Sequence, residues 1–158
     1  MRKRLAMIKL FLDTNIILSS LIPDRKGHLY CVSILLQNSI PLLTNEYVIK
    51  ELRRTLEEVY SFNKDDINQF IDFISTKIEI VKTPSKEEFK TINSKDKSDR
   101  PVIFSAKKHR CVLVTDDIPT KKDAEKYVLA VQSIEAIDIF NIKLAKEIEF
   151  KSLREDLV

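Results

Sequence analysis

Short apolar runs alternate along the chain with longer stretches in which apolar residues recur every three or four positions. The apolar runs lie at 7–12, 40–43, 78–81, 111–114 and 128–131. Such runs are typical of strands buried on both faces of a parallel sheet. The stretches of helical period lie at 16–22, 28–38, 45–60, 64–77, 96–110 and 133–144. This alternation predicts one α/β domain over residues 1–158, with a parallel sheet.

Polar residues mark several of the expected boundaries. Thr44 precedes the helix expected over 45–60 and is a residue type preferred as an N-cap, and Ser133 has the same place before the last helix. Residues 83–98 are polar and charge-rich with a weak pattern, which predicts a connection without regular structure.

The composition is that of a globular chain with a mildly basic balance. The 158 residues are 44% hydrophobic and 32% charged, and the net charge is +3. This balance permits a nucleic-acid partner without requiring one. The single glycine excludes the glycine-rich phosphate loops of Walker and Rossmann sites.

The cysteines and the N-terminus favour a cytoplasmic protein. Cys31 and Cys111 are far apart and sit in apolar stretches, so we expect buried, reduced thiols in a reducing compartment. Lys9 and Asp13 interrupt the apolar run that follows the basic N-terminus. That interruption disfavours both a signal peptide and a membrane-spanning helix.

Acidic residues stand at the ends of two predicted strands. Asp13 ends the first strand, and Asp116 and Asp117 follow the fourth. Sites in open α/β sheets form at the carboxyl ends of strands. Asp99 precedes a helix whose positive end favours its ionised form. Glu51 lies beside the apolar stripe of an earlier helix.

Each acid also has a purely structural interpretation. Asp13 is a suitable helix cap, and Glu51 can pair with Arg54 or Thr55 on a charged helix surface. Several carboxylates at one sheet edge repel each other, however, unless a cation neutralises them. Hard divalent cations prefer oxygen ligands, and the chain lacks the cysteine and histidine cluster of a zinc site. The acids therefore indicate a Mg²⁺-type site suited to phosphodiester hydrolysis.

Four segments of the chain resemble the acidic motifs of the PIN-domain nucleases. They are FLDTNIILS at 11–19, ELRRTL at 51–56, DKSDRPVI at 96–103 and VLVTDD at 112–117. Asp13, Glu51 and Asp99 match the first three acidic positions of that family in order and spacing. Asp117 matches the fourth by its distance from Asp99 and its place two residues after Thr115.

The resemblance implies a three-layer α/β/α sandwich with a central parallel sheet of about five strands. It also implies a Mg²⁺- or Mn²⁺-dependent endoribonuclease. Many relatives are toxins of toxin–antitoxin pairs and others process RNA. We therefore expect RNA as the substrate and an antitoxin protein as a candidate partner. A homodimer is also expected, because apolar helices at both ends of the chain exceed what the sheet needs.

The same resemblance assigns roles to the residues of the motifs. The expected metal ligands are Asp13, Asp99, Asp117 and, directly or through water, Glu51. Thr14, Asn15 and Thr115 are expected to hydrogen-bond these carboxylates or metal-bound waters. Adjacent strand residues point to opposite faces, so Asp116 is expected to turn away and to support the site by capping the turn near Thr120.

The chain departs from the family pattern at two places. Ser98 stands where relatives often have another Asp, and 118–120 stand where many carry a further Asp. The number of metal ions is therefore open. Asp123 is either a distant carboxylate of the site or a solvated helix charge.

Basic residues are candidates for holding the RNA backbone, each with a solvated surface charge as the alternative. They are Arg53, Arg54, Lys107, Lys108, Arg110, Lys121 and Lys122. Tyr47 and Tyr60 can stack on bases or pack against the core.

Two other functions would use the same residues. One is a PIN-like module that binds RNA or protein without cutting, against which the intact acids argue. The other is a phosphatase acting on small molecules. A polynucleotide would compete with small phosphomonoesters only if the site is an open groove.

Overall fold

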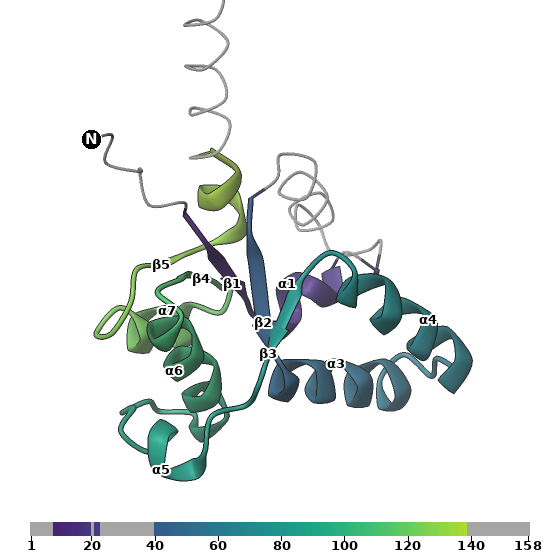
Figure 1. Ribbon diagram of the computed structural model, residues 1–158, viewed down its shortest axis with the longest axis horizontal. Helices are drawn as coiled ribbons and strands as arrows, with labels where there is room; N and C mark the ends of the chain where they lie inside the picture. Colours follow the sequence, from purple (N-terminus) through teal and green to yellow (C-terminus); the bar gives the residue numbers. More distant parts are fainter. Residues whose placement is uncertain (1–7, 20, 23–39, 139–158) are drawn as a thin grey trace, which may run out of the picture.

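A five-stranded parallel sheet forms the centre of the protein. The computed structural model describes residues 8–19, 21–22 and 40–138 (Figure 1). The strands are β1 (Leu10–Leu12), β2 (Leu42–Asn45), β3 (Glu79–Val81), β4 (Val112–Val114) and β5 (Ala130–Val131). They pair in parallel in the order β3-β2-β1-β4-β5. The predicted parallel sheet is therefore confirmed.

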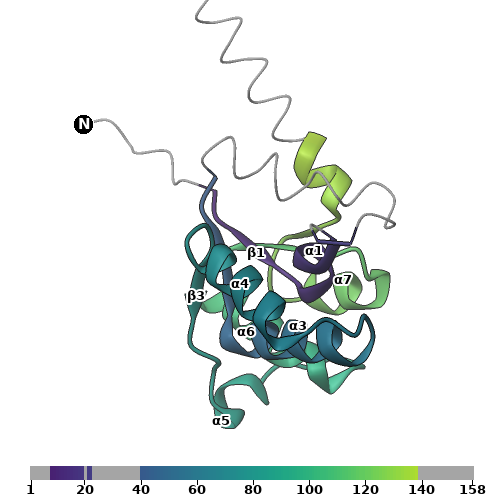
Figure 2. The same cartoon turned by 90° about the vertical axis from the view of Figure 1, so that its right-hand side faces the viewer.

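Helices cover both faces of this sheet and complete the predicted three-layer sandwich (Figure 1). On one face lie α1 (Thr14–Ser19), α3 (Glu46–Glu58) and α4 (Lys64–Ser75), which Figure 2 brings to the front. On the other lie α5 (Lys86–Phe89), α6 (Arg100–Lys108) and α7 (Ile118–Ala124), with the 3₁₀ turn η1 (Lys97–Asp99) before α6 (Figure 1). The chain moves outward from β1 to β3 and then returns to β4, so right-handed crossovers place the two sets of helices on opposite faces.

The central strands form the core because their side chains are apolar on both faces. Phe11, Leu12, Leu113 and Val114 are fully buried. Facing them, α3 buries Val48, Leu52 and Leu56, and α4 buries Ile67, Ile71 and Ile74, as the helical spacing predicts. The helix is shorter than the predicted 45–60, so Val59 lies beyond its end and is 67% exposed.

The start of α3 differs from the expectation. Thr44 is not the N-cap, because pairing of Thr44 with Ile80 of β3 keeps it in β2. Its hydroxyl donates to the Leu12 carbonyl, 3.0 Å away. The cap is Asn45, whose Oδ1 accepts the Val48 amide at 2.9 Å. Pairing with β3 thus extends the strand past the residue that local preference favoured as the cap.

Two further boundaries are corrected. The connection predicted over 83–98 contains α5, which begins with a capping box between Ser85 and Glu88. Four residues are too few to show a helical period. Ser133 does not cap the last helical segment, which the structure describes over 133–138, but is its first residue.

Some expectations lie outside the described residues, and others are met. The helix over 28–38, Cys31 and the continuation of the last helix beyond 138 are not described. Cys111 is a buried free thiol, as expected. No helix in the described part of the chain has the length and apolar character needed to span a membrane.

Candidate active site

The site lies where the order of the strands reverses. The first three strands extend the sheet in one direction from β1, and β4 then adds to its other side. In open α/β sheets, ligands bind beyond the carboxyl ends of the strands at this switch point. Asp13 directly follows β1, and Thr115 directly follows β4. The Asp13 amide donates to the Val114 carbonyl at 3.2 Å, which ties the two strand ends together.

The carboxylate of Asp13 is held on both oxygens. Its Oδ1 accepts the amide of Thr14 at 2.8 Å, and its Oδ2 accepts the hydroxyl of Thr115 at 2.9 Å. Burial nevertheless raises the pKa of Asp13 to about 6, and the nearby carboxylates of Glu51 and Asp117 raise it further, against the two hydrogen bonds. The group is therefore a half-buried acid whose negative charge is incompletely compensated.

Glu51 reaches this position from the helix that follows β2. The hydroxyl of Thr14 donates to its Oε2 at 3.0 Å. Thr14 therefore contacts Asp13 through its amide and Glu51 through its side chain. Asn15, which was also expected to support the acids, is exposed in the first turn of α1.

Asp99 approaches from the opposite layer, at the start of α6. Its Oδ2 accepts the hydroxyl of Thr120 at 3.0 Å. Its pKa is raised to about 6, first by burial and then by the charges of Asp13, Asp96 and Asp117, while Thr120 opposes the shift. The charge of Asp117 acts on both Asp13 and Asp99, and the charge of Asp13 acts on Asp99, so these three predicted acids face the same region of the structure.

Asp116 and Asp117 point in different directions, as the alternation of strand side chains predicts. Asp117 is the N-cap of α7, and its Oδ1 accepts the Thr120 amide at 3.3 Å. Asp116 does not cap that turn, contrary to expectation. Its Oδ1 instead accepts the amide and hydroxyl of Ser133, at 2.9 and 3.1 Å, in the first turn of the last helical segment.

A family model decides the identity of this fold and site. The model described as PIN domain matches residues 9–119, which include all four of the predicted acids. The chain belongs to the PIN-domain nuclease family. No curated protein gives a significant sequence match.

Solved structures share the PIN fold of this chain at low sequence identity. VapBC2 from Rickettsia felis, solved with a DNA fragment from its promoter, matches with a TM-score of 0.62 and 16% identity, over 79% of this chain and 98% of that one. DNA-bound VapBC from Salmonella typhimurium matches with a TM-score of 0.61 and 14% identity, over 80% of this chain and 99% of that one. FitAcB from Neisseria gonorrhoeae matches with a TM-score of 0.54 and 18% identity, over 78% of this chain and 97% of that one.

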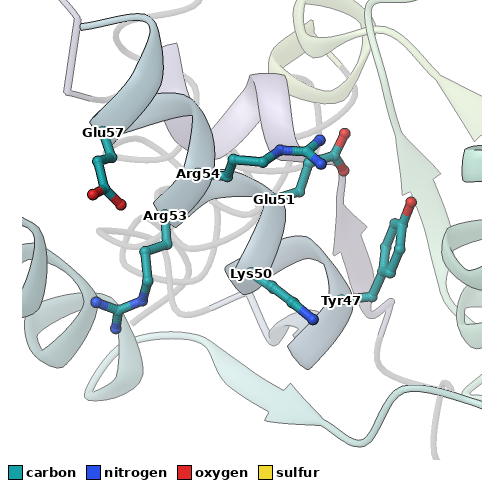
Figure 3. Close-up of a pocket in the computed structure, with 6 residues that line it drawn as sticks. All are labelled: Tyr47, Lys50, Glu51, Arg53, Arg54 and Glu57. Carbon is teal, nitrogen blue, oxygen red and sulfur yellow. The ribbon is translucent and has the colours of Figure 1, made fainter. Parts of the chain in front are cut away.

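The PIN site opens beside a surface pocket on α3. The pocket has a volume of about 460 Å³ and is lined by Tyr47, Lys50, Glu51, Arg53, Arg54 and Glu57 (Figure 3). Burial and then the charge of Glu51 raise the pKa of Tyr47, whereas the charge of Arg54 opposes the shift. Tyr47 and Arg54 therefore share the pocket with Glu51, one of the four predicted acids. Arg53 turns toward α4, where Nη1 donates to Oδ1 of Asn68 at 2.6 Å.

The other predicted RNA-binding residues divide into two groups. Lys107 and Lys108 end α6, at the opposite end of that helix from Asp99. There Lys107 Nζ lies 5.6 Å from the ring centre of Tyr127, and Lys108 pairs with Glu88 at 3.8 Å. On α7, Lys121 pairs with Glu135 at 3.3 Å and Glu125 at 3.7 Å, and Lys122 is exposed. Arg110, also exposed, follows α6 with a positive φ of 55°.

Sequence reasoning missed the buried polar residue that joins the two helical layers of the PIN site. Asn45, fully buried, donates through Nδ2 to the Pro101 carbonyl at 3.2 Å and to Ser105 Oγ at 2.9 Å. Because the same side chain caps α3, it ties the helix of Glu51 to the helix that follows Asp99. The sequence offers one local signal for it, since Thr44 and Asn45 follow the apolar run at 40–43 as Thr14 and Asn15 follow Asp13 after the run at 7–12.

Proposed function

We propose that the protein is a metal-dependent endoribonuclease that hydrolyses phosphodiester bonds of RNA. The observation that carries this proposal is the convergence of Asp13, Asp99 and Asp117 at the switch point of the sheet. Burial and mutual repulsion raise the pKa of the first two to about 6. A divalent cation would relieve that repulsion, which makes these acids suitable ligands.

The donor set fits a hard cation such as Mg²⁺ or Mn²⁺. Within the described ranges, no three acidic, histidine or cysteine side chains lie close enough to enclose a metal ion by themselves. Mg²⁺ is usually held by one or two carboxylates together with waters and substrate phosphate. The arrangement therefore suits a site in which Asp13 and its neighbours bind the ion partly through water. A bound ion would supply an activated water and neutralise charge on the phosphate.

The surrounding residues orient these acids. Thr115 and the Thr14 amide fix the two oxygens of Asp13, and the Thr14 hydroxyl fixes Glu51. Because these donors compete with water for the carboxylates, they also set which oxygen lone pairs remain for a metal ion or its waters. Glu51 completes the negative edge from the side of the pocket on α3.

RNA is the proposed substrate because cations lie beside one of these acids. Arg54 and Lys50 line the same pocket as Glu51. Such cations would hold phosphates next to the metal site. The family and the VapBC and FitAcB neighbours further support a toxin with an antitoxin partner. A homodimer and a cytoplasmic location also belong to the proposal, and they rest on the sequence alone.

The test measures cleavage of single-stranded RNA with Mn²⁺ or Mg²⁺, with a chelator, and for the Asp13→Asn variant. We expect cleavage only by the wild type with added metal. Undiminished cleavage in chelator would refute the metal mechanism. RNA binding without cleavage would indicate a binding module, and hydrolysis of p-nitrophenyl phosphate that RNA does not inhibit would indicate a phosphatase.

A further inference from the structure

The segment that carries Asp99 is held in place from outside the sheet. Residues 92–99 contain no strand and only the short turn η1. Within the segment, Ser94 Oγ donates to the Asp96 carbonyl at 2.6 Å, and Asp96 Oδ1 accepts the Ser98 amide at 2.9 Å. These local bonds shape the segment, but they do not fix it relative to Asp13.

Three contacts join this segment to α7 and the turn after it. The Asn93 amide donates to the Tyr127 hydroxyl at 2.8 Å. The Lys95 amide donates to Asp123 Oδ2 at 2.9 Å, and the Thr120 hydroxyl donates to Asp99 itself at 3.0 Å. Residues 120, 123 and 127 follow the spacing of one helix face. One side of α7 and its turn therefore contacts the segment at both of its ends and in its middle.

Asp123 is the most informative of these contacts. It is only 6% exposed, although Asp is rarely buried unless it is paired. The interpretation as a solvated helix charge is wrong, because the carboxylate is buried and accepts the Lys95 backbone amide, four residues before Asp99. Its other partner is Lys126, whose Nζ is 3.7 Å from Oδ1 at an exposed edge. A buried acceptor aimed at a backbone amide restrains the position of that amide.

Tyr127 is itself restrained. Its ring lies under Lys107 of α6, with 5.6 Å between Nζ and the ring centre. The Tyr127 amide also donates to the Ala124 carbonyl at 2.8 Å, which fixes the turn after α7. The hydroxyl that accepts the Asn93 amide is thus presented by a side chain held from two sides.

We infer that Asp123 and Tyr127 are positioning residues that set the place of Asp99 in the metal site. They act through the backbone amides of Lys95 and Asn93, and Thr120 acts directly on the carboxylate. The inference rests on the proposed function, because it gives Asp99 the role of a metal ligand. If the acceptor at Asp123 or at Tyr127 is lost, we expect residues 92–99 to become more mobile and metal binding to weaken, while the sheet stays intact.

The experiment compares Asp123→Ala, Asp123→Asn and Tyr127→Phe with the wild type. Asp123→Asn removes the charge but keeps a carbonyl oxygen that can accept the Lys95 amide. Tyr127→Phe keeps the ring under Lys107 and removes only the acceptor of the Asn93 amide. Ile74→Val on α4, in the opposite layer, controls for a general loss of stability. Lys126→Ala controls for the ion pair at the exposed edge.

Two readouts do not depend on RNA cleavage. The first is Mn²⁺ affinity from electron paramagnetic resonance titration. The second is amide hydrogen exchange of residues 92–99 in the metal-free protein. We expect Asp123→Ala to weaken Mn²⁺ binding about 10-fold, as loss of a group that supports a metal ligand does elsewhere. Exchange at Lys95 should rise by a similar factor. Tyr127→Phe should give a smaller change that is largest at Asn93.

The outcomes separate this inference from the proposed function. Rescue by Asp123→Asn, with normal Mn²⁺ affinity in Ile74→Val and Lys126→Ala, supports positioning through the acceptor. Normal Mn²⁺ affinity in Asp123→Ala would overturn the inference, whether or not the wild type cuts RNA. Equal losses in Asp123→Ala and Ile74→Val would reduce Asp123 to a contributor to overall stability. A wild type that binds Mn²⁺ but does not cut RNA contradicts the proposed function alone.

Discussion

Asp13 and Asp99 are two carboxylates of similar pKa that the protein holds in different ways. Asp13 continues a buried strand, and its amide bonds to the neighbouring strand at Val114. Asp99 ends a segment with no strand, and its carboxylate takes a side-chain hydrogen bond from Thr120. One half of the site is therefore fixed by the sheet and the other by side chains of α7.

This difference has consequences for function. A carboxylate built on a strand end keeps its place at no further cost, because sheet pairing already orders the backbone there. A carboxylate on an irregular segment depends on each contact that orders it, and each contact can be removed singly. We expect substitutions around Asp99 to give graded losses, whereas substitution of Asp13 itself removes the fixed point of the site.

The largest effect is expected for Asp13→Asn. The variant keeps the size of the side chain, and the Thr115 hydroxyl can reverse its hydrogen bond to accept from the new amide group. The lost charge leaves no anionic ligand at the strand end. RNA cleavage at saturating Mn²⁺ should fall more than about 100-fold, beyond the loss typical of groups that only support a ligand.

A matched control for this substitution is Asp65→Asn, an exposed acid in the first turn of α4. It removes the same charge from the chain without touching the site, so its cleavage rate should equal that of the wild type. Cleavage by Asp13→Asn at the wild-type rate would show that Asp13 is not a catalytic residue.

The next largest effect distinguishes Asp117 from Asp116. Asp117 raises the pKa of both Asp13 and Asp99, whereas Asp116 bonds to Ser133. Asp117→Asn should lower cleavage about 10-fold or more at limiting Mn²⁺. Asp116→Asn should leave cleavage nearly unchanged and lower the thermal midpoint, since it weakens the anchor of the 133–138 segment. If Asp116→Asn lowers cleavage and Asp117→Asn does not, the fourth acidic position belongs to Asp116.

The comparison also explains which parts of the site the sequence could predict. Asp13 and Asp117 follow short apolar runs, so local pattern places them at strand ends, and the topology then brings them together. The helical period places Glu51 beside the apolar stripe of α3, and the resemblance to the PIN family then selects Glu51 and Asp117 as acids of the site.

Asp123, Thr120 and Asn45 could not be assigned in this way. Asp123 looks like one more charge on a short polar helix, and only the fold shows that it faces the Lys95 amide, 28 positions earlier. In the sequence, Asn45 looks like the start of a helix. Its hydrogen bonds to Pro101 and Ser105 could not be foreseen, because these residues belong to another layer. Contacts between distant segments decide these roles.

A smaller effect is expected when the hydroxyl on Asp99 is removed. Thr120 is 3% exposed, so Thr120→Val keeps the packing while Asp99 loses its donor. Loss of a hydrogen bond to a charged group corresponds to roughly 1.5 kcal/mol, or about 10-fold in Mn²⁺ affinity. Saturating Mn²⁺ should restore most of the cleavage rate.

Thr115→Val is the corresponding change beside Asp13. Amide exchange should rise around Asp99 in Thr120→Val, whereas the Asp13 amide should stay protected in Thr115→Val because it remains bonded to Val114. Equal protection of both amides in the two variants would show that the two halves of the site are held alike.

The smallest effect is a dependence of the metal-free protein's stability on pH. A folded-state pKa raised from 3.8 to about 6 means that the folded protein binds more protons than the unfolded chain between these values. The free energy of unfolding should therefore fall as pH rises from about 4 to 6, and level off above that range. Acids with lowered pKa, such as Asp96 and Glu88, act in the opposite direction below pH 4. The difference in the free energy of unfolding between a variant and the wild type cancels that contribution.

Urea denaturation of the metal-free variants at pH 4, 5, 6 and 7 measures this dependence acid by acid. At pH 7 in chelator, Asp13→Asn should be more stable than the wild type, with the difference vanishing near pH 4. Asp99→Asn should show the same trend with a smaller amplitude, because Asp99 is nearer to solvent and its charge is better screened. A difference that grows toward low pH in either variant would contradict the raised pKa at that acid, and with it the uncompensated charge to which the metal ion is proposed to bind.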